Sequence, residues 1–274
     1  MNKQFYTYFS LLLLAFGLFF SSKVAAKTNL CFLAKENGQI LKKIGDTGTP
    51  YSPESTFKIA LSLMGFDYGI LKNESEPSWS LPDKVDLYIV LRNVCKKDQT
   101  PRTWIRDNCF WYSKILTTQL GMEKLQDYVT KFSYGNMNLS GKFREPWVSS
   151  SLRISAEGQT EFLQKLVDKR LPLSEESHTK TKEIMFIQEM VGGWKLYGKT
   201  GYGCLCDKNG DTTEVQHNWF VGYIEKGTRQ IVFASHVADS YKQAAFSPFR
   251  SKDNALMHLW NLIDELEKAK NDDE

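Results

Sequence analysis

The sequence lacks the clustered ligands of a metal site. Its four histidines are scattered, and its five cysteines include a single C-x-C pair with no second Cys or His cluster at ligand spacing. A protein-bound zinc ion needs three or four such ligands that converge on one point. We therefore expect no metal ion in this protein.

An excess of charge of either sign is also missing. The chain of 274 residues has 35 basic and 32 acidic side chains, which gives a formal net charge of +3. Nucleic acids and anionic membranes attract concentrated positive charge. We expect neither as a partner, and we expect a small-molecule substrate instead.

The longest hydrophobic run is too short to cross a membrane. It covers the 12 residues from Phe9 to Phe20, whereas a spanning helix needs about 20. Lys3 precedes the run and the small residues Val24-Ala25-Ala26 follow it, which is the pattern of a cleaved secretory signal. We predict that residues 1–26 are removed, that the mature chain starts near Lys27 without a membrane anchor, and that it reaches the periplasm.

Five cysteines in a secreted chain allow at most two disulfides and leave at least one thiol. Cys95 and Cys109 fit a pair by spacing alone, whereas Cys204 and Cys206 are too close to bridge each other without strain. The pairing among these four residues and Cys31 is left open by the sequence.

Hydrophobic patterning predicts strands near both ends of the chain and helices between them. The strands are expected at Leu30–Ala34, Ile40–Ile44, Trp194–Tyr197, Trp219–Glu225 and Gln230–Val237. The helices include Ile115–Val129, Thr160–Val167, an exposed one at Ser174–Glu183, and a last one over Ser251–Ala269 with Leu256, Leu259, Trp260, Ile263 and Leu266 on its apolar face. The predicted fold class is α/β, with an antiparallel sheet flanked by terminal helices (residues 27–50 and 192–274) and a mostly helical inserted domain (51–191).

Ser55-Thr56-Phe57-Lys58 lies at the start of a predicted buried helix. Ser52-Pro53 is typical of a helix start, because serine caps the first turn and proline there loses no hydrogen bond. Residues three apart share a helix face, so the Ser55 hydroxyl and the Lys58 amine can meet. Burial among apolar neighbours lowers the pKa of a lysine, and an uncharged amine can take the proton of a serine nucleophile.

The S-x-x-K motif alone is weak, because Ser177-His178-Thr179-Lys180 repeats it in the polar stretch Ser174–Glu183, where nothing is expected to desolvate the lysine. A second element, Lys199-Thr200-Gly201, occurs once, at the end of the strand predicted for Trp194–Tyr197. Such a strand end can present N–H groups to an acyl oxygen, while Lys199 and Thr200 would meet a substrate carboxylate. Without the first motif, we would interpret the lysine of this tripeptide as a surface residue before a turn.

Together the two elements are far more specific. A buried S-x-x-K helix start followed by K-T-G on a strand is typical of the penicillin-recognising serine enzymes. The chain also carries Tyr134-Gly135-Asn136, Trp147, Leu152-Arg153-Ile154-Ser155 and Tyr197-Gly198-Lys199-Thr200-Gly201. Over nearly the whole mature chain, the sequence resembles the class D (OXA-type) serine β-lactamases.

The resemblance implies the catalytic residues. Ser55 matches the nucleophile, and Lys58 matches the lysine that carbon dioxide converts to N-carboxylysine, the general base. Trp147 matches the tryptophan whose indole N–H holds that carbamate, and Ser113 matches the serine that relays a proton to the leaving nitrogen. The backbone N–H groups of Ser55 and Tyr202 would form the oxyanion hole.

The resemblance also implies substrate contacts beyond Lys199, Thr200 and Gly201. Arg250 matches an arginine that pairs with the drug carboxylate. Ile115 stands where the family has Val, and its additional methylene would alter the access of water to the carbamate. Val148, where the family often has Leu, would lie next to the deacylating water.

Three related kinds of protein fit the sequence less well. Class A enzymes carry Ser-Asp-Asn, whereas the nearest sequence here is Arg106-Asp107-Asn108; transpeptidases usually carry S-x-N, whereas this chain has Ser113-Lys114-Ile115. A β-lactam sensor domain, which stays acylated, generally has a polar residue at position 115 and hangs from transmembrane helices.

The resemblance therefore implies a secreted enzyme that hydrolyses penicillins and related antibiotics in two acyl-transfer steps and confers resistance to them. It implies no cofactor other than the carbon dioxide or bicarbonate that carboxylates Lys58. The substrate spectrum is left open, as is the choice between a monomer and a homodimer.

Overall fold

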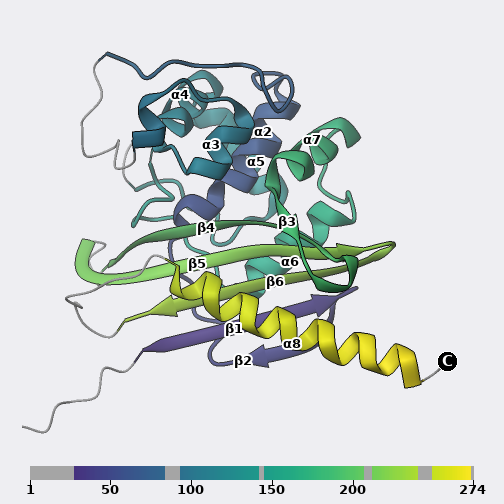
Figure 1. The fold of residues 1–274 in the computed structure, drawn as a ribbon. Helices are drawn as coiled ribbons and strands as arrows, with labels where there is room; N and C mark the ends of the chain where they lie inside the picture. The colour runs from purple at the N-terminus through teal and green to yellow at the C-terminus, as the bar shows by residue number, and fades with distance from the viewer. Residues whose placement is uncertain (1–27, 84–92, 142–144, 207–211, 240–248, 273–274) are drawn as a thin grey trace, which may run out of the picture.

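The computed structural model describes residues 28–83, 93–141, 145–206, 212–239 and 249–272. Within these ranges, one antiparallel sheet carries helices on both of its faces (Figure 1). This arrangement confirms the predicted α/β class. The predicted signal peptide lies outside the described residues, and no helix inside them has the length and apolar character that a membrane crossing requires.

The described sheet has six strands in the order β2-β1-β6-β5-β4-β3, and neighbouring strands are antiparallel. The strands are β1 (Asn29–Glu36), β2 (Gln39–Ile44), β3 (Phe186–Glu189), β4 (Lys195–Cys206), β5 (Thr212–Lys226) and β6 (Arg229–Ala238). Because β1 pairs with β6, an early strand and the last described strand lie side by side inside one sheet.

Along the chain, most of the described helices come after β2 and before β3 (Figure 1). In chain order they are the 3₁₀ turn η1 (Glu54–Phe57), α2 (Lys58–Asp67), η3 (Asn93–Lys96), α3 (Pro101–Asp107), α4 (Phe110–Leu120), α5 (Met122–Phe132), α6 (Ala156–Val167) and α7 (Glu175–Met185), followed by η4 (Val191–Gly193) and α8 (Arg250–Asp272). The single helix predicted for Ile115–Val129 is thus two helices. Gly121, with φ 80°, ends α4 and begins α5.

Two hydrophobic cores lie on opposite faces of the sheet. Successive residues of a strand point to opposite faces, so Val221 packs in the larger core with α2 and α4–α7 while Phe220 packs in the smaller core under α8. Leu259 and Ile263, four apart on α8, are buried in that smaller core. The prediction that Trp260 shares their face is wrong, because its side chain is 51% exposed.

The turn that leads into α2 differs from the sequence prediction. Ser52 does not cap the helix; its hydroxyl donates to the Ser150 carbonyl (3.2 Å) and accepts from the Ser150 N–H (3.0 Å). Pro53 occupies the cap position, and the first turn is a 3₁₀ helix rather than an α-helix. The Ser55 turn is therefore held by a tertiary contact with the loop around Ser150.

The sheet strands are longer than their hydrophobic runs suggest. Lys199-Thr200-Gly201 lies in the middle of β4, paired with Val221, Phe220 and Trp219 of β5. The prediction that this tripeptide ends its strand is wrong, because hydrogen bonding to β5 continues through its polar and glycine residues. The Lys199 side chain is nevertheless buried against the helical layer.

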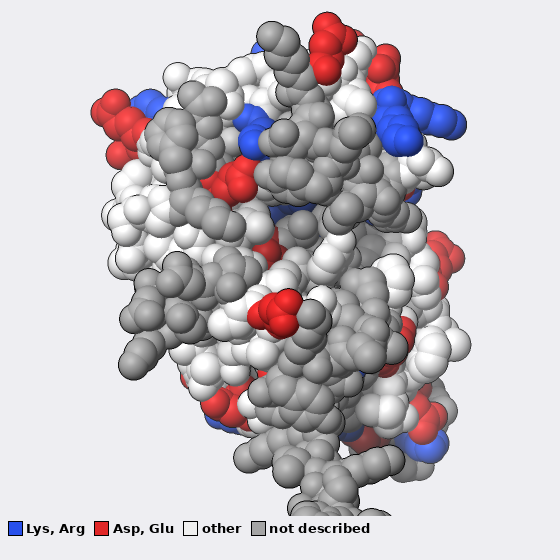
Figure 2. Space-filling model, turned by 90° about the vertical axis from the view of Figure 1, so that its left-hand side faces the viewer, with Lys and Arg blue, Asp and Glu red and all other residues white. Residues whose placement is uncertain are grey.

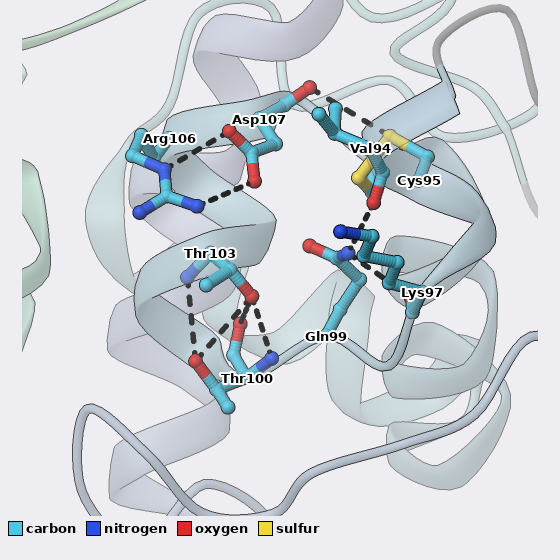
Figure 3. Close-up of polar contacts among 9 residues, drawn as sticks. Val94, Cys95, Lys97, Gln99, Thr100, Thr103, Arg106 and Asp107 are labelled. Atoms are coloured by element: carbon cyan, nitrogen blue, oxygen red, sulfur yellow. Dashed lines mark hydrogen bonds and ion pairs between the residues drawn. A yellow bond between two sulfur atoms is a disulfide. The ribbon is translucent and has the colours of Figure 1, made fainter.

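Cys95 and Cys109 form a disulfide that ties η3 to the residue before α4 (Figure 3). The spacing-based pairing is thus confirmed. The Trp111 indole donates to the Cys95 carbonyl (2.8 Å). Between the two cysteines, Thr100 and Thr103 form a capping box at the start of α3 (Figure 3). The bridge thus links η3 to the start of α4, and the capping box satisfies backbone N–H groups at the start of α3.

On the face in Figure 2, acidic and basic side chains are interspersed among uncharged ones. This distribution agrees with the small net charge of the sequence.

Candidate active site

Ser55 and Lys58 meet at the junction of η1 and α2. The Lys58 Nζ lies 3.0 Å from the Ser55 Oγ, in hydrogen-bond contact. Lys58 is 1% exposed, and its desolvation lowers the pKa of the amine from 10.5 to about 7, against an opposing effect of the Glu54 carboxylate. A large fraction of Lys58 is therefore uncharged near neutral pH and able to accept the Ser55 proton.

Strand β4 passes directly against the Ser55 turn. A Cβ atom at Gly201 would lie 3.0 Å from the Pro53 carbonyl oxygen and from the amide nitrogens of Ser55 and Thr56. A side chain larger than that of glycine would therefore have to push the Ser55 turn aside. The same register places Trp219 of β5 opposite Gly201, and the Trp219 indole donates to the Ser52 carbonyl (3.0 Å).

The remaining residues of the K-T-G region lie along β4 beside this contact. The Lys199 amine donates to the Thr200 carbonyl (3.0 Å) and lies 3.5 Å from the Thr200 hydroxyl. Tyr202 follows Gly201 and is 41% exposed. The structure thus places Gly201 against the Ser55 turn, with Lys199, Thr200 and Tyr202 beside it on the same strand.

Helix α4 brings Ser113 to the same side of the helical layer. The ring centre of Phe110, in the first turn of α4, lies 5.9 Å from the Lys58 Nζ, and Ser113 shares its face because the two residues are three apart. Ser113 is buried, and its hydroxyl accepts a hydrogen bond from the Trp104 indole (2.9 Å). Ile115 is half-buried against the larger core.

Trp147 is buried next to the helix that carries Lys58. Its ring stacks on that of Phe57, with centroids 5.3 Å apart, and its carbonyl accepts from the Glu54 N–H (3.0 Å). Val148 follows as a half-buried residue of the same turn. This position puts Trp147 against Phe57, the residue before the predicted base, and its hold on a carbamate stays a prediction.

Arg250 lies at the first residue of α8, where it interacts with Asp239 and Thr28. Its guanidinium forms an ion pair with Asp239 (2.6 Å) and donates to the Thr28 hydroxyl (3.1 Å). Asp239 follows the end of β6, and its side chain is 1% exposed. Arg250 thus satisfies a buried carboxylate of the protein, and its contact with a drug carboxylate stays a prediction.

The second S-x-x-K copy has no comparable pair. Ser177 is buried, and its hydroxyl contacts Ser174 (2.7 Å) and Asp67 (3.4 Å). Lys180 pairs with Glu176 (2.6 Å) and donates to the Lys72 carbonyl. The expectation that this stretch is solvated is wrong for Ser177, His178 and Thr181, which are buried. Lys180, however, meets a carboxylate and solvent rather than a serine.

Sequence reasoning missed Glu54, the residue directly before Ser55. Glu54 is 2% exposed and contacts His217 and Ser149. A charged residue at the start of an otherwise apolar buried helix was the available signal. The partners that explain it come from β5 and from the Trp147 turn, which lie far from it in the sequence.

Comparisons with known proteins agree on one family. A family model for the penicillin binding protein transpeptidase domain matches residues 34–253. The β-lactamase OXA-9 of Klebsiella pneumoniae is 37% identical over 229 residues, covering 81% of this chain and 83% of that protein. The crystal structure of the OXA-427 class D β-lactamase superposes with a TM-score of 0.79 at 32% identity, covering 86% of this chain and 99% of that one.

The chain belongs to the class D β-lactamases. The family assignment confirms the resemblance of the motifs and makes this protein a hydrolase. The C-terminal domain of the Bacillus licheniformis BlaR penicillin-receptor has the same fold, with a TM-score of 0.73 at 22% identity. At 22% identity, this likeness shows that the two proteins share a fold and nothing more.

Proposed function

We propose that this class D β-lactamase hydrolyses the amide bond of penicillins and related β-lactams through an acyl-enzyme on Ser55. The contact that supports this most directly is the 3.0 Å approach of the Lys58 Nζ to the Ser55 Oγ, inside a core that keeps much of the amine uncharged. A serine hydroxyl becomes a nucleophile when a neighbouring base takes its proton.

Acylation uses residues of η1, α2, α4 and β4. Lys58 accepts the Ser55 proton, and the Oγ atom attacks the lactam carbonyl. The N–H groups of Ser55 and Tyr202, on segments that touch at Gly201, stabilise the negative charge that develops on the carbonyl oxygen. Lys199 and Thr200 bind the drug carboxylate, and Ser113 relays a proton to the nitrogen that leaves the carbonyl carbon.

The site fits carboxylation of Lys58. Carbon dioxide reacts with an uncharged amine, and burial lowers the pKa of Lys58 to about 7. When carbon dioxide is bound to Lys58, the resulting carbamate would supply a base for acylation and for activation of the hydrolytic water. Trp147 would hold it through its indole N–H, while Ile115 and Val148 would limit the water that reaches it. Arg250 would add a contact to the drug carboxylate.

The N-terminal sequence pattern supports a proposal for where the enzyme acts. We propose that residues 1–26 direct export of the chain and are then cleaved off. The mature enzyme would act in the periplasm, where hydrolysis of the drug confers resistance. The proposed partners are β-lactam molecules and carbon dioxide or bicarbonate, with no metal ion or diffusible organic cofactor.

Turnover of a chromogenic cephalosporin by the purified mature chain tests this function, with and without bicarbonate. We expect repeated turnovers that increase with bicarbonate and disappear in Ser55→Ala. Lys58→Ala should lose both acylation and deacylation; near-normal turnover of that variant would contradict the base assignment. A single stoichiometric burst, indifferent to bicarbonate, would identify a sensor that keeps the drug bound.

A further inference from the structure

The mechanism above gives Glu54 no step of its own, although its carboxylate raises the pKa of Lys58 and the residue lies immediately before the nucleophile. Its side chain is 2% exposed, and its backbone adopts the left-handed conformation with φ 53°. Both features are unfavourable for an isolated glutamate, because burial desolvates the carboxylate and this conformation crowds the Cβ atom. Specific partners must therefore hold Glu54 in place.

Three hydrogen-bond contacts converge on one oxygen of the Glu54 carboxylate. The Oε1 atom accepts from the Ser149 N–H (2.8 Å) and the Ser149 hydroxyl (3.0 Å), and it lies 3.3 Å from the His217 Nε2. The His217 Nδ1 lies 3.0 Å from the Nε2 of His236, whose pKa is lowered by burial. The chain of contacts thus runs from the Trp147 turn through Glu54 to strands β5 and β6.

The same contacts join the segments that carry the proposed catalytic groups. The Glu54 N–H donates to the Trp147 carbonyl (3.0 Å), so the turn before Ser55 is linked to the Trp147–Ser149 turn through both backbone and side chain. The Ser149 hydroxyl accepts from the Cys204 N–H of β4 (3.1 Å). A Cβ atom at Gly203, the residue after Tyr202, would overlap the Glu54 carboxylate.

We propose that Glu54 is a positioning residue of the β-lactamase reaction. Its buried carboxylate holds the Ser55 turn, the Trp147–Ser149 turn and β4 together, and so fixes the two oxyanion-hole N–H groups relative to each other. The inference rests on the proposed function, because acyl transfer is the reaction that uses this hole. Donors fixed in advance stabilise charge that develops in the transition state, so Glu54 acts on the acylation rate rather than on drug binding.

Single-turnover acylation by a chromogenic cephalosporin tests this role, because it separates the Kd of the drug from the acylation rate constant. For Glu54→Ala we expect the rate constant to fall roughly 10²-fold, with a Kd within about twofold. Glu54→Gln keeps an acceptor oxygen for Ser149 and should recover most of that loss. The matched control is Tyr128→Phe, which removes a hydrogen bond to Asp67 (2.7 Å) in the helical layer and should leave both constants unchanged.

Acylation by Glu54→Ala within about threefold of the unsubstituted chain would overturn the proposal, as would a Gln variant as slow as the Ala variant. If Glu54→Ala does not fold, Ser149→Ala decides. A slower acylation at unchanged Kd supports the proposal, and an unchanged rate overturns it. A failure of the unsubstituted chain to acylate would instead refute the proposed function, and this inference with it.

Discussion

Replacing Lys58 with methionine should stabilise the fold while it abolishes the proposed catalysis. Burial lowers the pKa of Lys58 from 10.5 to about 7. At about 1.36 kcal/mol per tenfold change in proton affinity, this difference amounts to about 5 kcal/mol against the folded state when the amine is protonated. Methionine has a similar unbranched shape without the charge, so Lys58→Met should recover much of this free energy.

The gain in stability should depend on pH in a defined direction. Below its folded-state pKa of about 7, Lys58 is protonated in the folded and the unfolded chain, and the folded chain bears the full penalty. Between about pH 7 and 10.5 the unfolded chain binds the proton more tightly, so the unsubstituted protein gains stability as the pH rises. The advantage of Lys58→Met should shrink from about 5 kcal/mol near pH 6 to about 2 kcal/mol near pH 9.

Urea unfolding of both chains measures this difference. The buffers are depleted of carbon dioxide, because carboxylation would remove the ammonium group that carries the penalty. Lys180→Met, in the second S-x-x-K copy, is the matched control, and its effect should stay within about 0.5 kcal/mol at either pH. A Lys58→Met variant no more stable than the unsubstituted chain near pH 6, or one whose advantage does not shrink with pH, would refute the reasoning.

Three further substitutions test other contacts of the site. Gly201→Ala puts a Cβ atom 3.0 Å from the backbone of the Ser55 turn, and stopped-flow measurement should show acylation slowed roughly 10²-fold; normal acylation would mean that the turn can move aside. Trp147→Ala should slow deacylation more than acylation, and added bicarbonate should restore part of the loss; equal slowing of both steps would argue against a role in holding the carbamate. Arg250→Ala removes the ion pair between Arg250 and the buried Asp239 carboxylate, so urea unfolding should show a loss of about 3 kcal/mol; an unchanged KM for carboxylate-bearing drugs would remove Arg250 from the substrate site.

The strands and helices could be predicted where a residue pattern repeats with a regular period. The runs at Leu30–Ala34 and Gln230–Val237 lie inside β1 and β6, since alternate residues there face two apolar cores. The full length of β4 could not be predicted, because its lysine, threonine and glycine residues are held in the sheet by pairing with β5 rather than by their own propensity. The four-residue strand β3 is too short for a periodic signal.

The sequence by itself determined which residues could form the reactive pair, because residues three apart on a helix share a face. It also determined the presence of the K-T-G strand and, through the combined motifs, the family. Only the tertiary structure decided what acts on that pair. The burial that lowers the pKa of Lys58, the approach of Gly201 to the Ser55 turn, and the contacts of Glu54 with Ser149 and His217 all join segments distant in sequence. Desolvation and close packing depend on what lies around a residue in space, so no local pattern specifies them.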